Sequence, residues 1–505
     1  MNEITESVQE TKAPRTRKSG VLMHVSSLPG KYGIGSFGKE AFAFIDRLKE
    51  GGFTVWQTLP FCMPDTYGSP YSSYSAFSGN PFLIDLDTLV AEGFLTALEV
   101  SSELQSSPWL CEFERLQKTR IPLLKKAAAR AVSDPAVATK VDAFCAEHPQ
   151  IAEFCRFMAL KSANDDLPWY EWTTEAYDAA EERAWQFIQY EFCRQWEKVK
   201  AYAHENGILL VGDIPIYVAY DSSDVYYNRA HGIFDLDADG HKKNVAGVPP
   251  DFFAEEGQLW GNPLYNWKAM KEDGFAWWMA RLRHLLSQFD GVRIDHFRGL
   301  ESFWSVPADA KTAMAGKWIK GPGKPFIRAI RSVVEEVSED GTDRFVIAED
   351  LGVITKEVAD LVEYSGFPGM RVFQFAFVGD PETSHLPHNY PKNCVAYTGT
   401  HDNNTLLGYL WELDDETRRE MLDYCGYTDP DWRGGLDSMI RTVLRSQADL
   451  VVLPIQDLLG YGADTRINTP GTATGNWRYR VTAEQLDAID WKKYKHRNRL
   501  YSRCD

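Results

Sequence analysis

The stretch GVRIDHFRGL, Gly291–Leu300, has the alternation of a strand but carries charges on one side. Val292 and Ile294 are strand-forming residues on one face of the two-residue period, and Arg293 and Asp295 share the other face. Charges in a packed interior need partners. The pattern therefore has two interpretations. It is either a buried Arg–Asp ion pair or a pair of charges facing a substrate at the C-terminal mouth of a barrel strand.

Further apolar runs, separated mainly by helical-looking stretches, occur along the whole chain. Buried strands of parallel sheets read as near-continuous hydrophobic runs. In chain order the runs are Gly20–Leu28, Phe53–Pro60, Gly207–Ile216, Gly291–His296, Arg344–Asp350, Met370–Phe375, Cys394–Asp402 and Leu450–Leu458. Such an alternation predicts an α/β fold, specifically a (β/α)₈ TIM barrel.

A doubly wound open sheet is the alternative fold. It predicts a Gly-rich phosphate-binding loop after the first strand. The Gly-rich stretch Ser27–Gly38 contains neither GxGxxG nor a GK[ST] ending, so the barrel is favoured.

Two connections between the runs are too long to be single loops. Residues 61–206 begin with the aromatic, Ser-rich GSPYSSYSAFSGNP (Gly68–Pro81) and continue as a mostly helical insertion over about 86–200. Residues 217–290 form a loop-rich insertion. Both begin where a strand should end, so we expect inserted subdomains on the C-terminal face of the strands. The predicted organisation is a flexible tail over residues 1–18 and a single catalytic domain over residues 19–505.

The charge and aromatic content restrict the class of ligand. Lys and Arg number 54 and Asp and Glu 72, giving a net charge of −18. That charge disfavours nucleic acid as a partner and leaves a neutral substrate unaffected. The 16 Trp and 23 Tyr suit a sugar-binding protein, although such residues also pack in large cores.

The cysteines and the apolar runs bear on location. The eight Cys form no CxxC pair and no Cys/His spacing typical of zinc, so free thiols in a reducing cytoplasm are expected. The first 20 residues lack an apolar signal-peptide core, and no run approaches the ~20 apolar residues of a membrane span. We therefore expect a cytoplasmic protein with no membrane partner.

Acidic residues recur at the C-terminal ends of the predicted strands. They are Asp213, Asp295, Glu349 and Asp402, the last preceded by His401. Carboxylates gathered onto one face suit glycoside chemistry, which needs one carboxylate as nucleophile and one carboxylic acid as proton donor. Clustered acids also bind Mg²⁺ or Ca²⁺, and isolated acids at strand ends can simply be solvated.

Several motifs resemble one known family. RIDHFRG, IAEDLG and YTGTHDN, in this order, resemble the 4-α-glucanotransferases (amylomaltases or disproportionating enzymes), glycoside hydrolase family 77 of the α-amylase superclan. The likeness runs from HVSSLPG (His24–Gly30) to GTATGNWRYR (Gly471–Arg480) and covers most of the chain. It implies a (β/α)₈ barrel with inserted subdomains, no required metal or cofactor, and retaining transglycosylation. The implied partners are α-1,4-glucans, maltooligosaccharides and glucose.

The resemblance also implies roles for individual residues. Asp295 would be the nucleophile, Glu349 the general acid and then base, with a raised pKa, and Asp402 the third carboxylate. Substrate-binding positions carried over in the same way are Ser69, Tyr71, Asp213, Phe252, Phe253, Trp260, Arg293, His401 and Asn468. An α-1,4-glucan hydrolase is the alternative enzyme, because water and a sugar hydroxyl attack the same intermediate. A catalytically silent glucan-binding protein is less favoured, because binding alone needs no complete acid and nucleophile.

Overall fold

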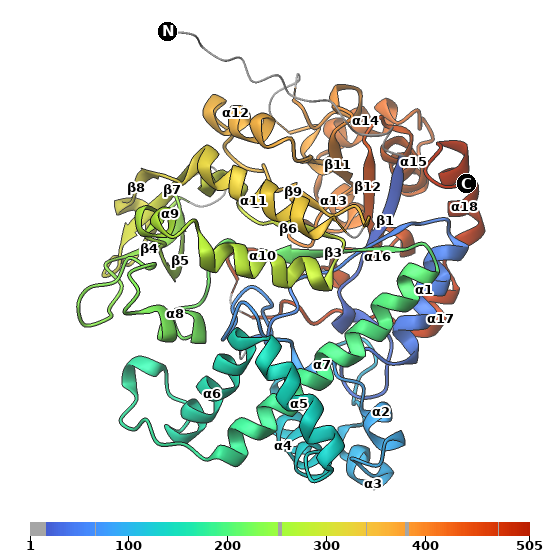
Figure 1. The fold of residues 1–505 in the computed structure, drawn as a ribbon. Coiled ribbons are helices and arrows are strands. Elements are labelled where there is room, and N and C mark those ends of the chain that lie inside the picture. The colour runs from blue at the N-terminus through green and yellow to red at the C-terminus, as the bar shows by residue number, and fades with distance from the viewer. Residues whose placement is uncertain (1–16, 66, 251–254, 340, 379–382, 473) are drawn as a thin grey trace.

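A closed barrel of parallel strands forms the centre of the computed structural model, which describes residues 17–65, 67–250, 255–339, 341–378, 383–472 and 474–505 (Figure 1). The barrel strands are β1 (Lys18–Leu22), β2 (Val55–Gln57), β3 (Leu209–Ile214), β6 (Gly291–Ile294), β9 (Phe345–Ala348), β10 (Gly369–Val372), β11 (Cys394–Tyr397) and β12 (Leu450–Pro454). Neighbours around the barrel follow chain order, and β12 pairs with β1 to close it. Each predicted run contributes one strand, so the (β/α)₈ prediction is confirmed.

The strands are shorter than the apolar runs that predicted them. Beyond β1 the chain forms a 3-10 turn at Val25–Ser27, and beyond β10 it forms another at Phe373–Phe375. Val25 and Phe373 in these turns remain buried although they have left the strand, whereas Phe375 is exposed. Hydrophobicity continues past the barrel rim because the turns are covered by inserted segments, so the run length overstates the strand length.

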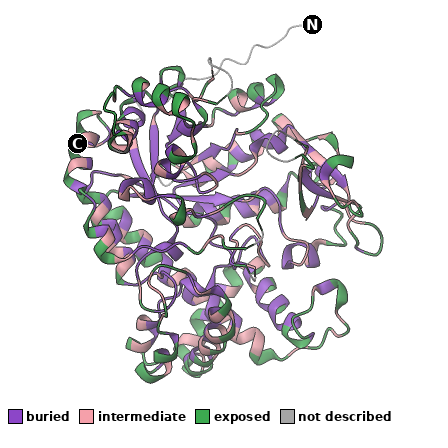
Figure 2. Ribbon diagram, turned by 180° about the vertical axis from the view of Figure 1, so that it is seen from behind, coloured by how far each residue is buried: buried purple, intermediate pink, exposed green. Residues whose placement is uncertain are grey.

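The two faces of each barrel strand pack against different cores. Leu22, Val211, Met370 and Val452 belong to a cluster of apolar residues inside the barrel. Val292 and Ile294 belong instead to the larger core between the strands and the surrounding helices. Arg293 therefore points into the barrel, as the two-residue period predicts. Nearly all residues of the barrel strands are buried, whereas the helices around them expose their outer faces (Figure 2).

Helices in the connections cover the outside of the barrel. They include α1 (Lys39–Glu50), α7 (Ala179–Glu205), α10 (Ala276–Gln288), α11 (Gly323–Val337), α12 (Lys356–Ser365), α15 (Leu436–Arg445) and α18 (Trp491–Leu500). In α11 the buried residues Phe326, Ile327, Ile330 and Val333 recur at helical spacing, so one apolar stripe faces the barrel. Smaller helices of the same half of the chain are α13 (Leu406–Glu412), α14 (Asp415–Tyr424), α16 (Ile455–Leu459) and α17 (Ala483–Asp487).

The connection between β2 and β3 forms a helical body below the barrel in Figure 1. Its helices are α2 (Leu86–Ala91), α3 (Ala97–Val100), α4 (Phe113–Ala131), α5 (Pro135–Glu147), α6 (Pro149–Ala163) and the start of α7. Asp85, Asp134 and Asp178 cap α2, α5 and α7 by accepting backbone N–H bonds. The single helix α7 runs from this body back to β3, so it belongs to the insertion and to the barrel wall at once.

A second sheet, which the sequence did not predict, lies beside the barrel. It is antiparallel and contains β4 (Asn244–Val248), β5 (Gln258–Pro263), β7 (Ser302–Pro307) and β8 (Lys317–Lys320), in the order β5-β4-β7-β8. Two of its strands come from the predicted loop-rich insertion and two from the connection that follows β6. The short helices α8 (Ser223–Asn228) and α9 (Trp267–Glu272) flank it.

Two further findings concern the expectations about location. All eight cysteines are free thiols. In the part of the chain that the structure describes, no helix combines the length and the apolar character needed to cross a membrane.

Candidate active site

Arg293, on β6, links two carboxylates inside the barrel. Its Nη1 donates to Asp213 Oδ2 at 2.6 Å and its Nη2 donates to Asp295 Oδ1 at 2.7 Å. Burial opposes the guanidinium charge, but the two carboxylates outweigh it and raise the pKa of Arg293 further. Arg293 and Asp295 therefore form an ion pair, as the first interpretation of the strand pattern predicts. Asp295 also keeps 27% of its side chain exposed at the barrel mouth, as the second interpretation predicts.

Asp213, on β3, is enclosed more completely than Asp295. Its side chain is 0% exposed, and burial raises the pKa of its carboxyl although the Arg293 charge opposes the shift. Tyr71 donates its hydroxyl to Asp213 Oδ2 at 2.7 Å, and the same hydroxyl lies 3.0 Å from His401 Nε2. The Tyr71 ring is stacked on the imidazole at 5.3 Å with an interplanar angle of 16°. Residues from three separate segments thus form one wall of the site.

Glu349 follows β9 and is held by backbone groups. Its two carboxyl oxygens accept hydrogen bonds from His296 N at 2.7 Å and Leu351 N at 2.9 Å. His296 reaches this position by adopting the left-handed conformation, with φ of 51°, which is unusual for a residue other than glycine. Burial raises the pKa of Glu349 to about 8; the nearby Asp295 charge adds to the shift, while Arg293 and the two N–H groups oppose it. The predicted upward shift of the Glu349 pKa is confirmed.

Asp402 and Asn468 lie on the loops that follow β11 and β12. Asn468 donates its side-chain amide to Asp402 Oδ1 at 2.6 Å, and Asp402 Oδ2 lies 3.2 Å from His401 Nε2. Burial works against the Asp402 charge, but His401 and Asn468 outweigh it and hold the pKa of Asp402 below its ordinary value. Burial also works against a charged His401, and the Asp402 charge outweighs that burial and raises the pKa of His401.

The remaining predicted site residues lie at the rim. The Ser69 hydroxyl accepts a hydrogen bond from Tyr71 N at 3.3 Å, so Ser69 helps to orient Tyr71. Trp260, on β5, is 37% exposed and lies edge-on to His296, with ring centroids 4.9 Å apart. Phe252 and Phe253 lie outside the described residues. The structure therefore brings the other predicted residues around one barrel mouth.

Known proteins are similar to this chain along nearly its whole length. A family model described as 4-alpha-glucanotransferase matches residues 23–486. The chain belongs to this family. A 4-alpha-glucanotransferase of Streptococcus pneumoniae is 43% identical over 489 residues, covering 94% of this chain and 94% of that protein. The chloroplastic/amyloplastic 4-alpha-glucanotransferase of Arabidopsis thaliana is 41% identical over 506 residues, covering 96% of this chain and 85% of that protein.

A solved structure supports the same assignment. The amylomaltase from Streptococcus agalactiae in complex with acarbose matches with a TM-score of 0.90 and 35% identity, covering 97% of this chain and 100% of that chain. The predicted family and fold class are thus both confirmed.

Sequence reasoning missed two residues that shape the site of this 4-alpha-glucanotransferase family member. Trp477 lies beside Tyr71 and His401, with ring centroids 5.5 Å and 5.9 Å away. It has a left-handed backbone with φ of 66°, two residues after Gly475, and its N–H donates to Ile467 O at 2.7 Å. An aromatic residue in a Gly-rich loop was the available signal. Asp457, on α16, is the second, and only its position just after an apolar run marked it.

Asp457 ties together the two ends of the loop that carries His401 and Asp402. Its carboxylate accepts hydrogen bonds from Thr398 Oγ1 at 2.5 Å and Leu406 N at 2.8 Å, and the residue is 2% exposed. Asp457→Asn replaces one acceptor oxygen by a donor and should let this loop shift. We expect kcat/KM on maltotriose to fall by up to about 10²-fold, because small displacements of positioned groups are costly.

A matched control for Asp457 exists at the opposite end of the barrel. Asp290 is also 2% exposed. Its carboxylate accepts a hydrogen bond from Leu210 N at 2.8 Å and is ion-paired with Arg344. Asp290→Asn should lower the melting temperature and leave kcat/KM unchanged. Equal kinetic losses in the two variants would mean that Asp457 acts only on stability.

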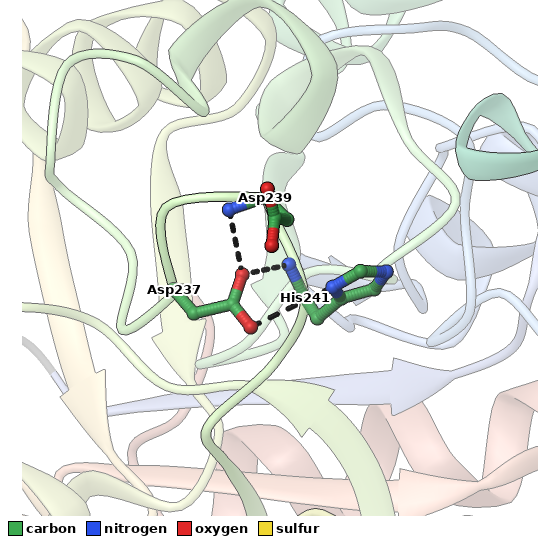
Figure 3. A group of neighbouring side chains, drawn as sticks. All are labelled: Asp237, Asp239 and His241. Atoms are coloured by element: carbon green, nitrogen blue, oxygen red, sulfur yellow. Dashed lines mark hydrogen bonds and ion pairs between the residues drawn. The ribbon is translucent and has the colours of Figure 1, made fainter.

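One cluster with the spacing of a metal site occurs among the described residues, and it lies outside the barrel mouth. It comprises Asp237, Asp239 and His241, all exposed, in a turn between Leu236 and Lys242 (Figure 3). Asp237 Oδ1 accepts hydrogen bonds from Asp239 N at 2.9 Å and His241 N at 2.8 Å, and these bonds account for the shape of the turn. At the barrel mouth Arg293 already supplies positive charge to the carboxylates. The expected absence of a required metal or cofactor stays a prediction.

Proposed function

We propose that this chain transfers a segment of an α-1,4-glucan to the 4-hydroxyl of glucose or another glucan by a retaining double displacement. Family membership and the relatives named 4-alpha-glucanotransferase support the activity. The position of Asp295 and Glu349 after the neighbouring strands β6 and β9 supports glycosyl transfer, because this chemistry needs a nucleophile and a proton donor at the same bond.

In the first step, Asp295 attacks the anomeric carbon of the donor. The glycosidic bond breaks, and Glu349 gives its proton to the departing 4-oxygen. This produces a covalent glycosyl-enzyme and releases the reducing-side part of the donor. Arg293 orients Asp295 for the attack, because its Nη2 donates to Asp295 Oδ1 at 2.7 Å.

In the second step, Glu349, now ionised, removes the proton from the 4-hydroxyl of the acceptor. The acceptor oxygen attacks the anomeric carbon and frees Asp295. Two inversions give overall retention of the α-configuration. The site needs no change of residues between the steps, since the same carboxyl group serves as acid and then as base.

The other residues of the mouth bind the donor sugar in this proposal. Asp402, Asn468 and His401 present hydrogen-bonding groups from one side. Tyr71 offers an aromatic face and a hydroxyl, with Ser69 orienting it and Asp213 accepting its hydrogen bond. Trp260, together with Phe252 and Phe253 by resemblance, covers the acceptor side.

The observation that carries the proposal is the contrast between two neighbouring carboxyl groups. Burial raises the pKa of Glu349 to about 8, so this group holds a proton at neutral pH. Asp295 is instead held by Arg293, whose Nη2 lies 2.7 Å from Asp295 Oδ1. Glycoside chemistry requires one carboxyl group that carries a proton and a second that acts as nucleophile.

Maltotriose decides between transfer and hydrolysis. A transferase converts it to glucose and longer chains with almost no rise in total reducing ends. The measurement follows glucose and total reducing sugar together over time. Reducing ends that rise in step with glucose would establish the hydrolase instead, and no reaction at all would indicate a glucan-binding protein.

Trp260 should determine how well a sugar competes with water for the glycosyl-enzyme. Water is present at about 55 M, so a positioned acceptor wins only if the site holds it and excludes solvent. Trp260→Ala should therefore shift products toward hydrolysis, with a smaller shift at high glucose. An unchanged ratio of glucose to total reducing ends would place Trp260 outside the acceptor site.

The pH dependence should report the protonated Glu349. Its pKa of about 8 predicts that kcat/KM on maltotriose falls as pH rises through about 8, because the free enzyme loses the proton needed for the first step. The measurement is kcat/KM between pH 5 and about 10 at constant ionic strength. A fall that begins below about pH 6 would contradict the assignment.

A cytoplasmic setting, and the absence of nucleic-acid and membrane partners, remain predictions. The free thiols of all eight cysteines support the first of these.

A further inference from the structure

The second sheet presents a row of apolar side chains on one face. Leu259, Gly247, Trp304 and Trp318 are cross-strand neighbours on β5, β4, β7 and β8, so their side chains share one face. Trp318 is 42% exposed and Leu259 38% exposed. The Trp304 ring lies edge-on to Trp318 at 5.1 Å and donates Nε1 to Ala313 O at 2.9 Å. Trp304 therefore supports Trp318, which remains open to solvent at the edge strand.

Arg298 connects Trp318 to the active site. It lies in the 3-10 turn Phe297–Leu300, directly after Asp295 and His296, and its guanidinium stands 3.9 Å from the centre of the Trp318 ring. Its Nη1 donates to Val353 O at 2.6 Å. Val353 follows Glu349 by a few residues and is 63% exposed. One buried arginine thus joins the nucleophile turn, the acid loop and the edge of the second sheet.

The chemistry of the reaction assigns a side of the site to these residues. Glu349 protonates the oxygen of the departing glucan, so the reducing-side chain lies on the Glu349 side of Asp295. Val353 belongs to the loop that follows Glu349, and Arg298 contacts both Val353 and Trp318, so these two residues are assigned to that side.

We propose that Trp318 and Val353 form an outlying contact for the reducing-side part of a long α-1,4-glucan, beyond the sugars held at Glu349. The contact rests on the proposed function and adds a chain-length preference to it. An indole ring pairs with the apolar face of a pyranose, and its fixed position lowers the entropy lost on binding. Short substrates such as maltotriose end before they reach this surface.

The test compares short and long substrates in the Trp318→Ala variant. We expect kcat/KM on long amylose, with glucose as acceptor, to fall by about three- to tenfold, an effect of the size that aromatic contacts give. Maltotriose disproportionation should stay within about twofold of the unmutated enzyme by the same reasoning. Trp318→Phe should retain most of the amylose activity, which guards against a loss caused by misfolding.

Trp432 provides a matched control. It is also packed against an arginine, with Arg418 at 4.9 Å from its ring centre, but it lies between α14 and α15 on the other side of the barrel from β7 and β8 (Figure 1). Trp432→Ala should leave both activities unchanged.

Three results would overturn the proposal. Equal losses on maltotriose and amylose would assign Trp318 to the active site or to stability alone. Undiminished activity of Trp318→Ala on amylose would show that Trp318 does not contact the glucan. A change of sedimentation mass in Trp318→Ala would identify the surface as an interface between copies of the chain. The retardation of the protein in gels that contain amylose measures glucan binding without catalysis. A failure of the proposed contact can therefore be distinguished from a failure of the proposed transferase reaction.

Discussion

Asp295→Asn is expected to abolish transfer, with kcat reduced by about 10⁴-fold or more, as for removal of other catalytic nucleophiles and their partners. The amide is a neutral, weak nucleophile, and it cannot form the glycosyl ester. The loss should be the same with maltotriose and with an activated α-glucosyl fluoride, because both donors need the nucleophile. The measurements are glucose release from maltotriose and fluoride release from the activated donor.

A second Arg-paired aspartate serves as the control for Asp295→Asn. Asp437 is ion-paired with Arg497 and Lys493 outside the site. Asp437→Asn should keep full activity. If Asp295→Asn releases fluoride at an undiminished initial rate, another carboxylate must be the nucleophile.

Glu349→Gln is expected to slow the reaction with maltotriose far more than the reaction with the glucosyl fluoride. With maltotriose, whose leaving group needs a proton, turnover should fall by about 10²–10⁴-fold. With the fluoride, which leaves without a proton, the first step should be largely spared. Normal transfer from maltotriose by this variant would show that Glu349 is not the acid.

The same variant should be more stable than the unmutated protein. The folded chain holds a proton on Glu349 between its ordinary pKa of 4.5 and about 8, whereas the unfolded chain has lost it. The free energy of unfolding therefore falls as pH rises through this window. Gln removes that dependence, so its gain in melting temperature should be larger at pH 8 than at pH 5. A gain that does not depend on pH would argue against the raised pKa.

The barrel could be predicted because each of its strands is buried on both faces. Strands such as Leu450–Pro454 and Cys394–Tyr397 are therefore uninterrupted apolar runs in the sequence. The site followed from the barrel, since acids that come directly after such runs must gather at one end. Arg293 was placed inside because only the two-residue period was needed to orient it.

The second sheet could not be predicted because its strands lack that signal. β8 reads KWIK and β5 reads QLWGNP, and β4 pairs with β7 across more than fifty residues of chain. Such strands are defined by their partners rather than by their own composition. The left-handed turn at His296 was equally invisible, because histidine does not mark positive φ as glycine does. The backbone bonds that hold Glu349 depend on that turn.

In the proposed reaction, the sharing of Arg293 between Asp213 and Asp295 has a further consequence. In the free enzyme one positive charge faces two negative ones, and the surplus negative charge helps Glu349 to keep its proton. When Asp295 becomes an ester, its charge disappears and Arg293 is left balanced against Asp213 alone. The guanidinium then lowers the proton affinity of Glu349 without opposition from Asp295. Formation of the covalent intermediate thus turns a proton donor into a proton acceptor, and its breakdown restores the donor. The alternation between acid and base is in this way timed by the state of the nucleophile itself, with no movement of the protein.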